Sequence, residues 1–261
     1  MSHLFTELIG ELIGGTLKLI YALYEEIRFQ LYFSPLIHRV LRSNNPYFIH
    51  LRTDQQNQFL RKVRDNYLYF QFVPIGTKLK KRQKIIIAAA AAKLILFLPD
   101  EALSYFTKIL VYPDYYRSRI TGRMHKGEVN PGLQVIVFSK KGIVGGNKIH
   151  DDGINLLHHE FAHALWLEHK LVGHSYDVLD AHLVNQFEEY AAKEINAIQN
   201  IEGHFFRKYA FENQAEFFAV AVENLFERPG LFQMQQPLLF DILVALFKQN
   251  PLAVSPKAFR R

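Results

Sequence analysis

The 261-residue chain contains no cysteine. Disulfide bonds and thiolate metal sites are therefore excluded, and any metal ion must be held by His, Asp or Glu. Long apolar runs are also missing: residues 85–98 form an apolar stretch interrupted by Lys93, whereas a membrane span requires about 20 apolar residues. The N-terminus lacks the cationic start and small-residue cleavage site of a signal peptide. We expect a cytoplasmic protein, with peripheral membrane association as an alternative.

The sequence also lacks the features of a nucleic-acid-binding protein. Its net charge is +6, but much of that charge falls in one short run directly before an apolar helix. A nucleic-acid surface would need basic residues spread over a face, with stacking aromatic residues between them. We therefore expect no nucleic-acid partner and interpret the run as a solvated loop and first helical turn. Its members are Lys78, Lys80, Lys81, Arg82 and Lys84.

The first 33 residues form a distinct segment. Apolar residues recur there at helical spacing, and Gly14-Gly15 interrupts the pattern. We predict an amphipathic N-terminal helical segment over residues 1–33, followed by one domain over residues 34–261. We expect the apolar side of the segment to pack on that domain, and contact of residues 3–33 with a membrane surface is the alternative.

The remaining sequence predicts an α+β fold. The early part is helical, with Thr53 as the expected N-cap of one helix, and β-branched and aromatic runs then indicate strands. From Asp151 onward the pattern is helical, and Asp151 or Asp152 is the expected cap of the next helix. Strands followed by a helical half are typical of an α+β domain. The segment 67–74 is expected to end as a short strand, and further strands are predicted over residues 107–113 and 133–139. The later helices are predicted over residues 155–169, 213–229 and 237–251.

Residues 155–169 hold four of the twelve histidines. His159, Glu160 and His163 match the pattern H-E-x-x-H, which places the two histidines on one face of a helix, one turn apart. Both can bind one Zn²⁺, while Glu160 can reach a water activated by that ion and accept its proton. The structural alternative is a pair of histidines hydrogen-bonded in the core. The remaining histidines are interpreted as surface or core residues; these include His150, His158, His174 and His182.

A catalytic zinc site needs a third protein ligand, and two candidates are present. His169 has the spacing of the extended motif H-E-x-x-H-x-x-G-x-x-H, but Trp166 stands at the glycine position and suits a left-handed turn poorly. Glu216 lies 53 residues after the second histidine and precedes an apolar run. A negative charge next to such a buried run is costly unless a cation compensates it. The steric argument favours Glu216. Glu212 and Glu223 are weaker candidates, and Glu223 is also suited to orient a ligand histidine.

Two segments of the chain resemble a known family. The segments "DGINLLHHEFAHALW" and "YAFENQAEFFAVAVENLFERPGLF" are similar to the zinc peptidases of the Mlc titration factor A family. These are gluzincins whose catalytic domain is related to the anthrax lethal factor. The resemblance covers roughly residues 35–252 and implies a zincin-like domain with a small mixed sheet and an active-site helix.

The resemblance implies specific roles for five residues. His159, His163 and Glu216 would bind one zinc ion per chain, Glu160 would be the catalytic base, and Tyr209 would donate its hydroxyl to the oxyanion. The family is associated with aminopeptidase activity and with binding of a transcriptional repressor. One position differs, because the family commonly has Asp where this chain has Trp166. We therefore expect a zinc peptidase that acts on peptides or proteins, and specifically an aminopeptidase. The alternative is a regulatory protein-binding factor, a partner of a transcription regulator, with a structural or vestigial zinc site.

Overall fold

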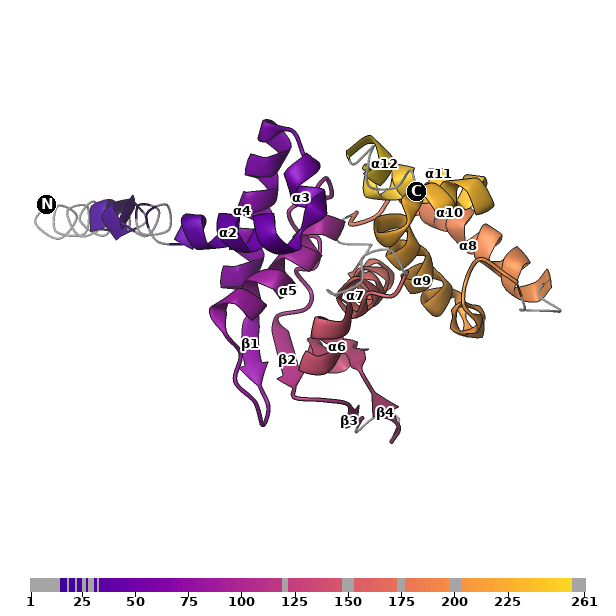
Figure 1. Cartoon of the computed structure of the whole chain (residues 1–261), viewed down its shortest axis with the longest axis horizontal. Helices are drawn as coiled ribbons and strands as arrows, with labels where there is room; N and C mark the ends of the chain where they lie inside the picture. Colours follow the sequence, from indigo (N-terminus) through magenta and orange to yellow (C-terminus); the bar gives the residue numbers. More distant parts are fainter. Residues whose placement is uncertain are drawn as a thin grey trace, which may run out of the picture.

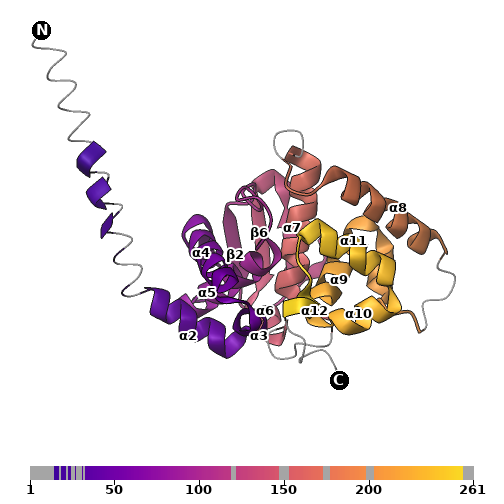
Figure 2. The same ribbon diagram turned by 90° about the horizontal axis from the view of Figure 1, so that it is seen from above.

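The structure is a computed structural model in which α-helices surround a small sheet (Figure 1). The N-terminal helices lie on one side of the sheet region and the C-terminal helices on the other (Figure 2). This arrangement confirms the expected α+β fold with a small mixed sheet. The structure describes residues 15–17, 19–21, 23, 24, 27, 31, 33–118, 122–146, 153–172, 177–197 and 203–254.

Four helices form the N-terminal layer. They are α2 (Ser34–Asn44), α3 (Pro46–His50), α4 (Thr53–Tyr69) and α5 (Lys81–Leu94). The chain turns between α2 and α3 at Asn45, whose side chain accepts a hydrogen bond from the Phe48 amide. Arg52, rather than Thr53, occupies the N-cap position of α4. A run of five alanines in α5 is buried, and these small side chains let neighbouring helices approach closely.

The main sheet has four strands in the order β1-β2-β6-β5. Strands β1 (Gln71–Pro74), β2 (Lys108–Tyr112) and β6 (Val135–Ser139) are parallel, whereas β5 (Gly127–Asn130) runs antiparallel to β6. The short strands β3 (Tyr116–Arg117) and β4 (Met124–His125) form a separate antiparallel pair. The sequence predicted the three parallel strands but not β3, β4 or β5, which lie in a stretch rich in turn residues.

Helices α7 (Leu156–Val172) and α9 (Gln214–Glu227) pack together at the centre of the molecule (Figure 2). Their contact is part of the main hydrophobic core, which also takes in the buried faces of the sheet. Phe161 of α7, for example, packs against both Phe138 of β6 and Phe70. The other elements are α6 (Lys140–Gly146), α8 (Ala181–Ala197), η3 (Lys208–Glu212), α10 (Pro229–Gln235), α11 (Pro237–Phe247) and α12 (Pro251–Val254), with η2 (Pro131–Leu133) before β6.

Helix α7 is capped by a residue that the sequence did not single out. Asn155 Oδ1 accepts hydrogen bonds from the amides of Leu157 and His158, at 3.1 and 3.2 Å. Such a cap satisfies amide groups that have no partner within the helix. Asp151 and Asp152, which were the predicted caps, lie outside the described residues, as do His150 and His174.

The N-terminal segment differs from its prediction. Most of its described apolar side chains are exposed rather than packed on the domain: Leu19 is 72% exposed and Tyr21 66%. Phe33, at the end of the segment, is the exception and packs against Tyr67. The described part of this segment projects away from the body of the molecule in both views (Figures 1 and 2).

Within the described ranges, no helix combines the length and the apolar character that crossing a membrane would require.

Candidate metal centre

Helix α7 carries both histidines of the H-E-x-x-H pattern. It is buried along most of its length, and His159 and Glu160 are only 8% and 5% exposed. His163 follows one helical turn after His159 and is less deeply buried. The imidazole rings lie with their centres 4.6 Å apart. The helical spacing therefore brings the two rings together, as the sequence predicted.

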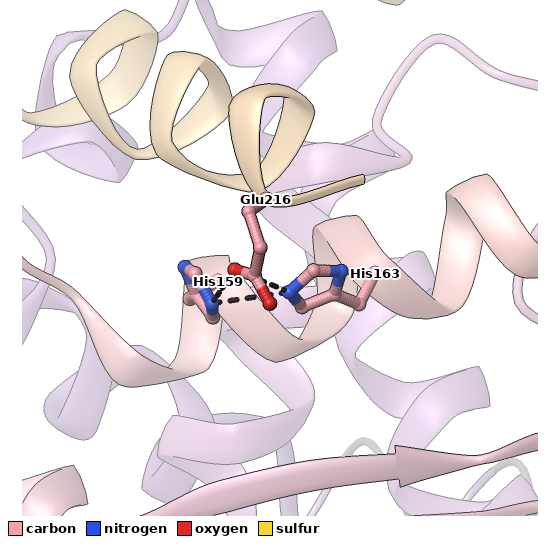
Figure 3. A group of neighbouring side chains, drawn as sticks. All are labelled: His159, His163 and Glu216. Carbon is pink, nitrogen blue, oxygen red and sulfur yellow. Dashed lines mark hydrogen bonds and ion pairs between the residues drawn. The ribbon is translucent and has the colours of Figure 1, made fainter. Parts of the chain in front are cut away.

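Glu216 reaches the same point from α9. The side chain of Asn213 caps this helix by accepting a hydrogen bond from the Glu216 amide at 3.0 Å. Glu216 therefore lies in the first turn of α9, where the aligned peptide dipoles favour a negative charge. Its carboxylate points from α9 toward the space between the two histidines (Figure 3).

The three side chains converge on one small volume. His163 Nε2 lies 3.1 Å from His159 Nε2 and 3.2 Å from Glu216 Oε2. His159 Nε2 lies 3.3 Å from the same oxygen (Figure 3). Among the described residues, these three form the group of His, Asp and Glu side chains that could hold a metal ion together.

The chemistry of these donors suits a cation. His159 Nδ1 lies 2.6 Å from Glu223 Oε1, and a proton on Nδ1 leaves the lone pair of Nε2 facing Glu216. Burial opposes a charge on the imidazole, but hydrogen bonds to Glu216 and Glu223 outweigh it and raise the pKa of His159 to about 10. The surroundings therefore stabilise a positive charge at this point. Two imidazole nitrogens and one carboxylate oxygen at this spacing fit a divalent metal ion.

Glu223 supports this arrangement from two turns further along α9. The side chain is 1% exposed and also accepts a hydrogen bond from the Asn155 amide at 2.8 Å. Arg207 Nη2 lies 2.5 Å from Glu223 Oε1, and Arg207 Nη1 lies 3.3 Å from Oε2. This two-point contact holds the buried carboxylate in the orientation that meets His159.

Glu160 lies against the edge strand of the sheet. A Cβ atom added to Gly127 of β5 would collide with the Glu160 carboxylate, so the missing side chain makes room for it. Burial raises the pKa of Glu160, and the charges of His159 and His163 oppose that shift. A buried carboxyl group with a raised pKa beside a candidate metal site is suited to proton transfer.

Tyr209 lies on the other side of the group, in η3. Its hydroxyl donates a hydrogen bond to Glu216 Oε1 at 2.8 Å, and its ring centre lies 6.0 Å from that of His159. The side chain is 42% exposed. Partial burial and the Glu216 carboxylate raise the pKa of Tyr209, so the hydroxyl keeps its proton at neutral pH.

His169 lies away from the centre. Helix α7 continues through Trp166 and His169 to Val172 without a turn, which separates His169 from His163 by about 9 Å along the axis. Trp166 packs against Phe218, with ring centres 4.9 Å apart. The geometry therefore agrees with the steric argument against His169. Glu212 is exposed and outside the group, and His182 is an exposed residue next to Gln186.

Three residues that shape this centre were not predicted from the sequence: Arg207, Asn155 and Gly127. Arg207 and Asn155 have no spacing relation to the motif that would mark them. Gly127 gave a signal, because a glycine at the start of a strand often marks a close approach of another group. The turn-rich composition around it concealed the strand.

Comparison with known proteins agrees with this geometry. Residues 25–248 match the family described as glucose-regulated metallo-peptidase M90. An uncharacterized protein of Synechocystis is 23% identical over 248 residues, covering 87% of this chain and 89% of that protein. Mlc titration factor A of Yersinia pestis and of Yersinia pseudotuberculosis is 26% identical over 203 residues, covering 70% of this chain and 73% of the relative. The family match begins within the segment that the sequence set apart as residues 1–33. The chain belongs to the glucose-regulated metallopeptidase family M90.

Proposed function

We propose that the chain is a zinc-dependent peptidase in which His159, His163 and Glu216 hold one zinc ion. The observation that carries this proposal is the convergence of their donor atoms within 3.1–3.3 Å of one another, from two separate helices. Two histidines and one glutamate leave a fourth position open, as a catalytic zinc site requires. Zinc bound there would supply Lewis acidity, which polarises a peptide carbonyl and makes water a stronger acid.

In this proposal Glu160 is the general base. Its carboxylate is buried beside the two histidines, and burial raises its pKa. It accepts a proton from the attacking water and then delivers that proton to the nitrogen of the leaving amine. Gly127 allows the carboxylate to lie directly against β5.

Tyr209 supplies a hydrogen-bond donor for the oxyanion. Its hydroxyl, which keeps its proton, donates to Glu216 in the structure. Because the side chain is partly exposed, the hydroxyl can turn to a substrate carbonyl oxygen as negative charge develops there.

A substrate peptide would lie along β5. This strand is at the edge of the described sheet, so one side of its backbone is free of strand partners. An extended peptide can add to such an edge through main-chain hydrogen bonds. Since Gly127 of β5 contacts Glu160, a peptide bound there would pass next to the catalytic base.

We further propose that the enzyme acts in the cytoplasm and that it removes N-terminal residues. A library of peptides with free amino termini, compared with the same library acetylated, tests that specificity. Preferential cleavage of peptides with free amino termini is expected, and equal cleavage of both sets would identify an endopeptidase.

The name of the Mlc titration factor A relatives supports a second hypothesis, in which a protein regulator binds to this chain.

Metal analysis tests the ligand set. We expect one zinc ion per chain, with loss of binding in His163→Ala and strong weakening in Glu216→Gln. His169→Ala is the matched control and should keep its zinc. The opposite pattern, with zinc lost in His169→Ala and kept in Glu216→Gln, would show that the third ligand is His169.

A further inference from the structure

A second polar site lies behind the metal centre. A cavity of about 50 Å³ lies between α2, α3, α5, the start of α7 and the end of α9, and it is open on one side. The cavity is several times larger than the ~10–15 Å³ that one water molecule requires. Its opening is at the corner between α2 and α3, where Asn44 and Asn45 are partly exposed and Pro46 is exposed. The walls include Ile86 and Ala89, and the polar groups are Lys93, Asn155, His158 and Glu227.

Lys93 brings a buried positive charge to this cavity. The residue is 8% exposed, and its hydrogen bond to the Phe226 carbonyl is long, at 3.4 Å. The ammonium group lies 5.2 Å from the ring centre of Tyr47 and 5.1 Å from that of Phe226. Burial lowers the pKa of Lys93 to about 8, against the attraction of Glu227, so the side chain is mostly charged at neutral pH. Its ammonium has three protons to donate and one long protein hydrogen bond.

Glu227 brings a buried acceptor to the same cavity. The residue is 2% exposed. Its Oε1 atom accepts a hydrogen bond from Asn155 Nδ2 at 3.0 Å, but its Oε2 atom is buried without a hydrogen-bond partner. His158 is 4% exposed, and its Nδ1 atom also lacks a hydrogen bond although it lies 3.2 Å from Glu227 Oε1.

These two charges are not paired with each other. Both residues line the cavity, but the described ion pairs do not join Lys93 to Glu227 directly. Glu227 Oε2 has no hydrogen-bond partner and Lys93 has one long hydrogen bond, whereas most buried polar groups are hydrogen-bonded and leaving them unsatisfied is costly. The arrangement therefore calls for a molecule that accepts from Lys93 at one end and donates to Glu227 at the other.

We propose that this cavity is a second binding site, which takes a small zwitterion of the size and charge of glycine. The carboxylate of the ligand accepts hydrogen bonds from the Lys93 ammonium. The ammonium of the ligand donates to Glu227 Oε2. Opposite charges on the protein match opposite charges on the ligand, so the complex is neutral, whereas a simple anion would meet Glu227 and a simple cation would meet Lys93. The volume of about 50 Å³ and the apolar wall, which includes Ile86, exclude amino acids with large side chains.

The site is linked to the metal centre through Asn155. The side chain of Asn155 donates to Glu227, and its backbone amide donates to Glu223 Oε2 at 2.8 Å. Glu223 in turn contacts His159 Nδ1. A ligand that shifts Glu227 therefore acts on the residue that orients His159, and zinc and the zwitterion should change each other's affinity by the same factor.

Calorimetric titration of the full chain with glycine tests the site. We expect saturable binding of one glycine per chain, whereas acetate and methylammonium, which each carry half of the charge pattern, should bind far more weakly. Lys93→Met and Glu227→Gln should each weaken glycine binding by roughly tenfold or more, the loss of one hydrogen bond to a charged group. Lys62→Met is the control, because Lys62 is a buried lysine paired with Asp100 elsewhere and its loss should leave glycine binding unchanged.

The titration is made with zinc-loaded and with zinc-free protein, so that glycine at the metal ion is distinguished from glycine in the cavity. Binding at the metal would disappear without zinc and survive in Lys93→Met, which would overturn the proposal. No saturable binding to folded wild-type protein would overturn it as well. If the cavity variants do not fold, a crystal structure of the wild type soaked in glycine decides: density that joins Lys93 to Glu227 supports the site, and water alone refutes it. Glu160→Gln should bind glycine like the wild type, so failure of the peptidase proposal leaves this test intact.

Discussion

Glu223 is the residue whose replacement most directly tests how the ligand His159 is held in place. We consider Glu223→Gln, which keeps the size of the side chain and removes its charge. The carboxylate receives His159 Nδ1 at 2.6 Å, the Asn155 amide at 2.8 Å and two nitrogens of Arg207. The glutamine side chain has one acceptor oxygen in place of two. Its NH₂ group would face one of these donors and could not accept its hydrogen bond. Loss of such a supporting contact lowers metal affinity by ~10–100-fold, which corresponds to about 1.4–2.7 kcal/mol.

The same substitution should destabilise the fold moderately. Breaking a fully buried ion pair costs ~3–5 kcal/mol, but the Arg207 side chain is 32% exposed and water can replace part of the contact. We therefore expect a loss of roughly 1–3 kcal/mol, the range for an unpaired polar group. Competition with a chelator measures zinc affinity, and denaturant unfolding measures stability. Glu212→Gln, which changes an exposed carboxylate nearby, is the control. Unchanged zinc affinity in a folded Glu223→Gln protein would refute the orienting role of Glu223.

Three further predictions follow from particular contacts. Gly127→Ala should reduce the rate of peptide hydrolysis by about 100-fold, because the added methyl group displaces Glu160 and a displacement of about 1 Å can cost this much. Zinc content should stay at the wild-type value. A wild-type rate would show that Glu160 does not need the space beside residue 127. Tyr209→Phe should keep zinc and lower kcat by ~100–1,000-fold through loss of one oxyanion donor, and a kcat equal to that of the wild type would exclude the role. Burial lowers the pKa of Lys93 from its ordinary value of 10.5 to about 8 in the folded chain, so between these pH values the unfolded chain binds more protons and stability rises with pH. Relative to Lys93→Met, the wild type should gain roughly 3 kcal/mol from pH 8 to pH 10.5, measured by denaturant unfolding. A stability difference that does not change with pH would contradict the burial of Lys93.

The pairing of the two histidines on α7 could be predicted because it depends only on residues one helical turn apart. Positions i and i+4 of a helix share a face whatever surrounds them, so His159 and His163 meet as predicted. The exclusion of His169 also depended on a local property, the inability of Trp166 to make a left-handed turn easily. Helix α7 does continue through both positions.

The contribution of α9 required more than local information. The apolar run after Glu216 indicated a buried helix, but its docking against α7 comes from packing across 53 residues of sequence. Arg207 and Asn155 could not be found for the same reason. Each contacts Glu223 through a fold-dependent arrangement, and neither lies at a spacing that a helix or strand would impose.

The edge strand β5 was missed because two local signals conflict. Gly127 and the Asn130-Pro131-Gly132 sequence favour a turn, whereas pairing with β6 extends residues 127–130 into a strand. Tertiary pairing overrides local preference here. The expected packing of the N-terminal segment was wrong for most of its described residues, Phe33 excepted. An apolar helix face predicts that another surface covers it, but it does not identify that surface. The division at residues 33 and 34 stays a prediction.

The most direct test of the proposed chemistry is the rate of peptide hydrolysis by zinc-loaded Glu160→Gln, compared with the wild type at equal zinc content. Glu160 is buried beside the two histidines but is not one of the three converging donors. Its replacement should therefore leave one zinc ion per chain and lower turnover by at least ~100-fold, the low end for loss of a general base. Equal turnover by the two proteins would contradict the assignment of Glu160 as the base and, with it, the proposed mechanism.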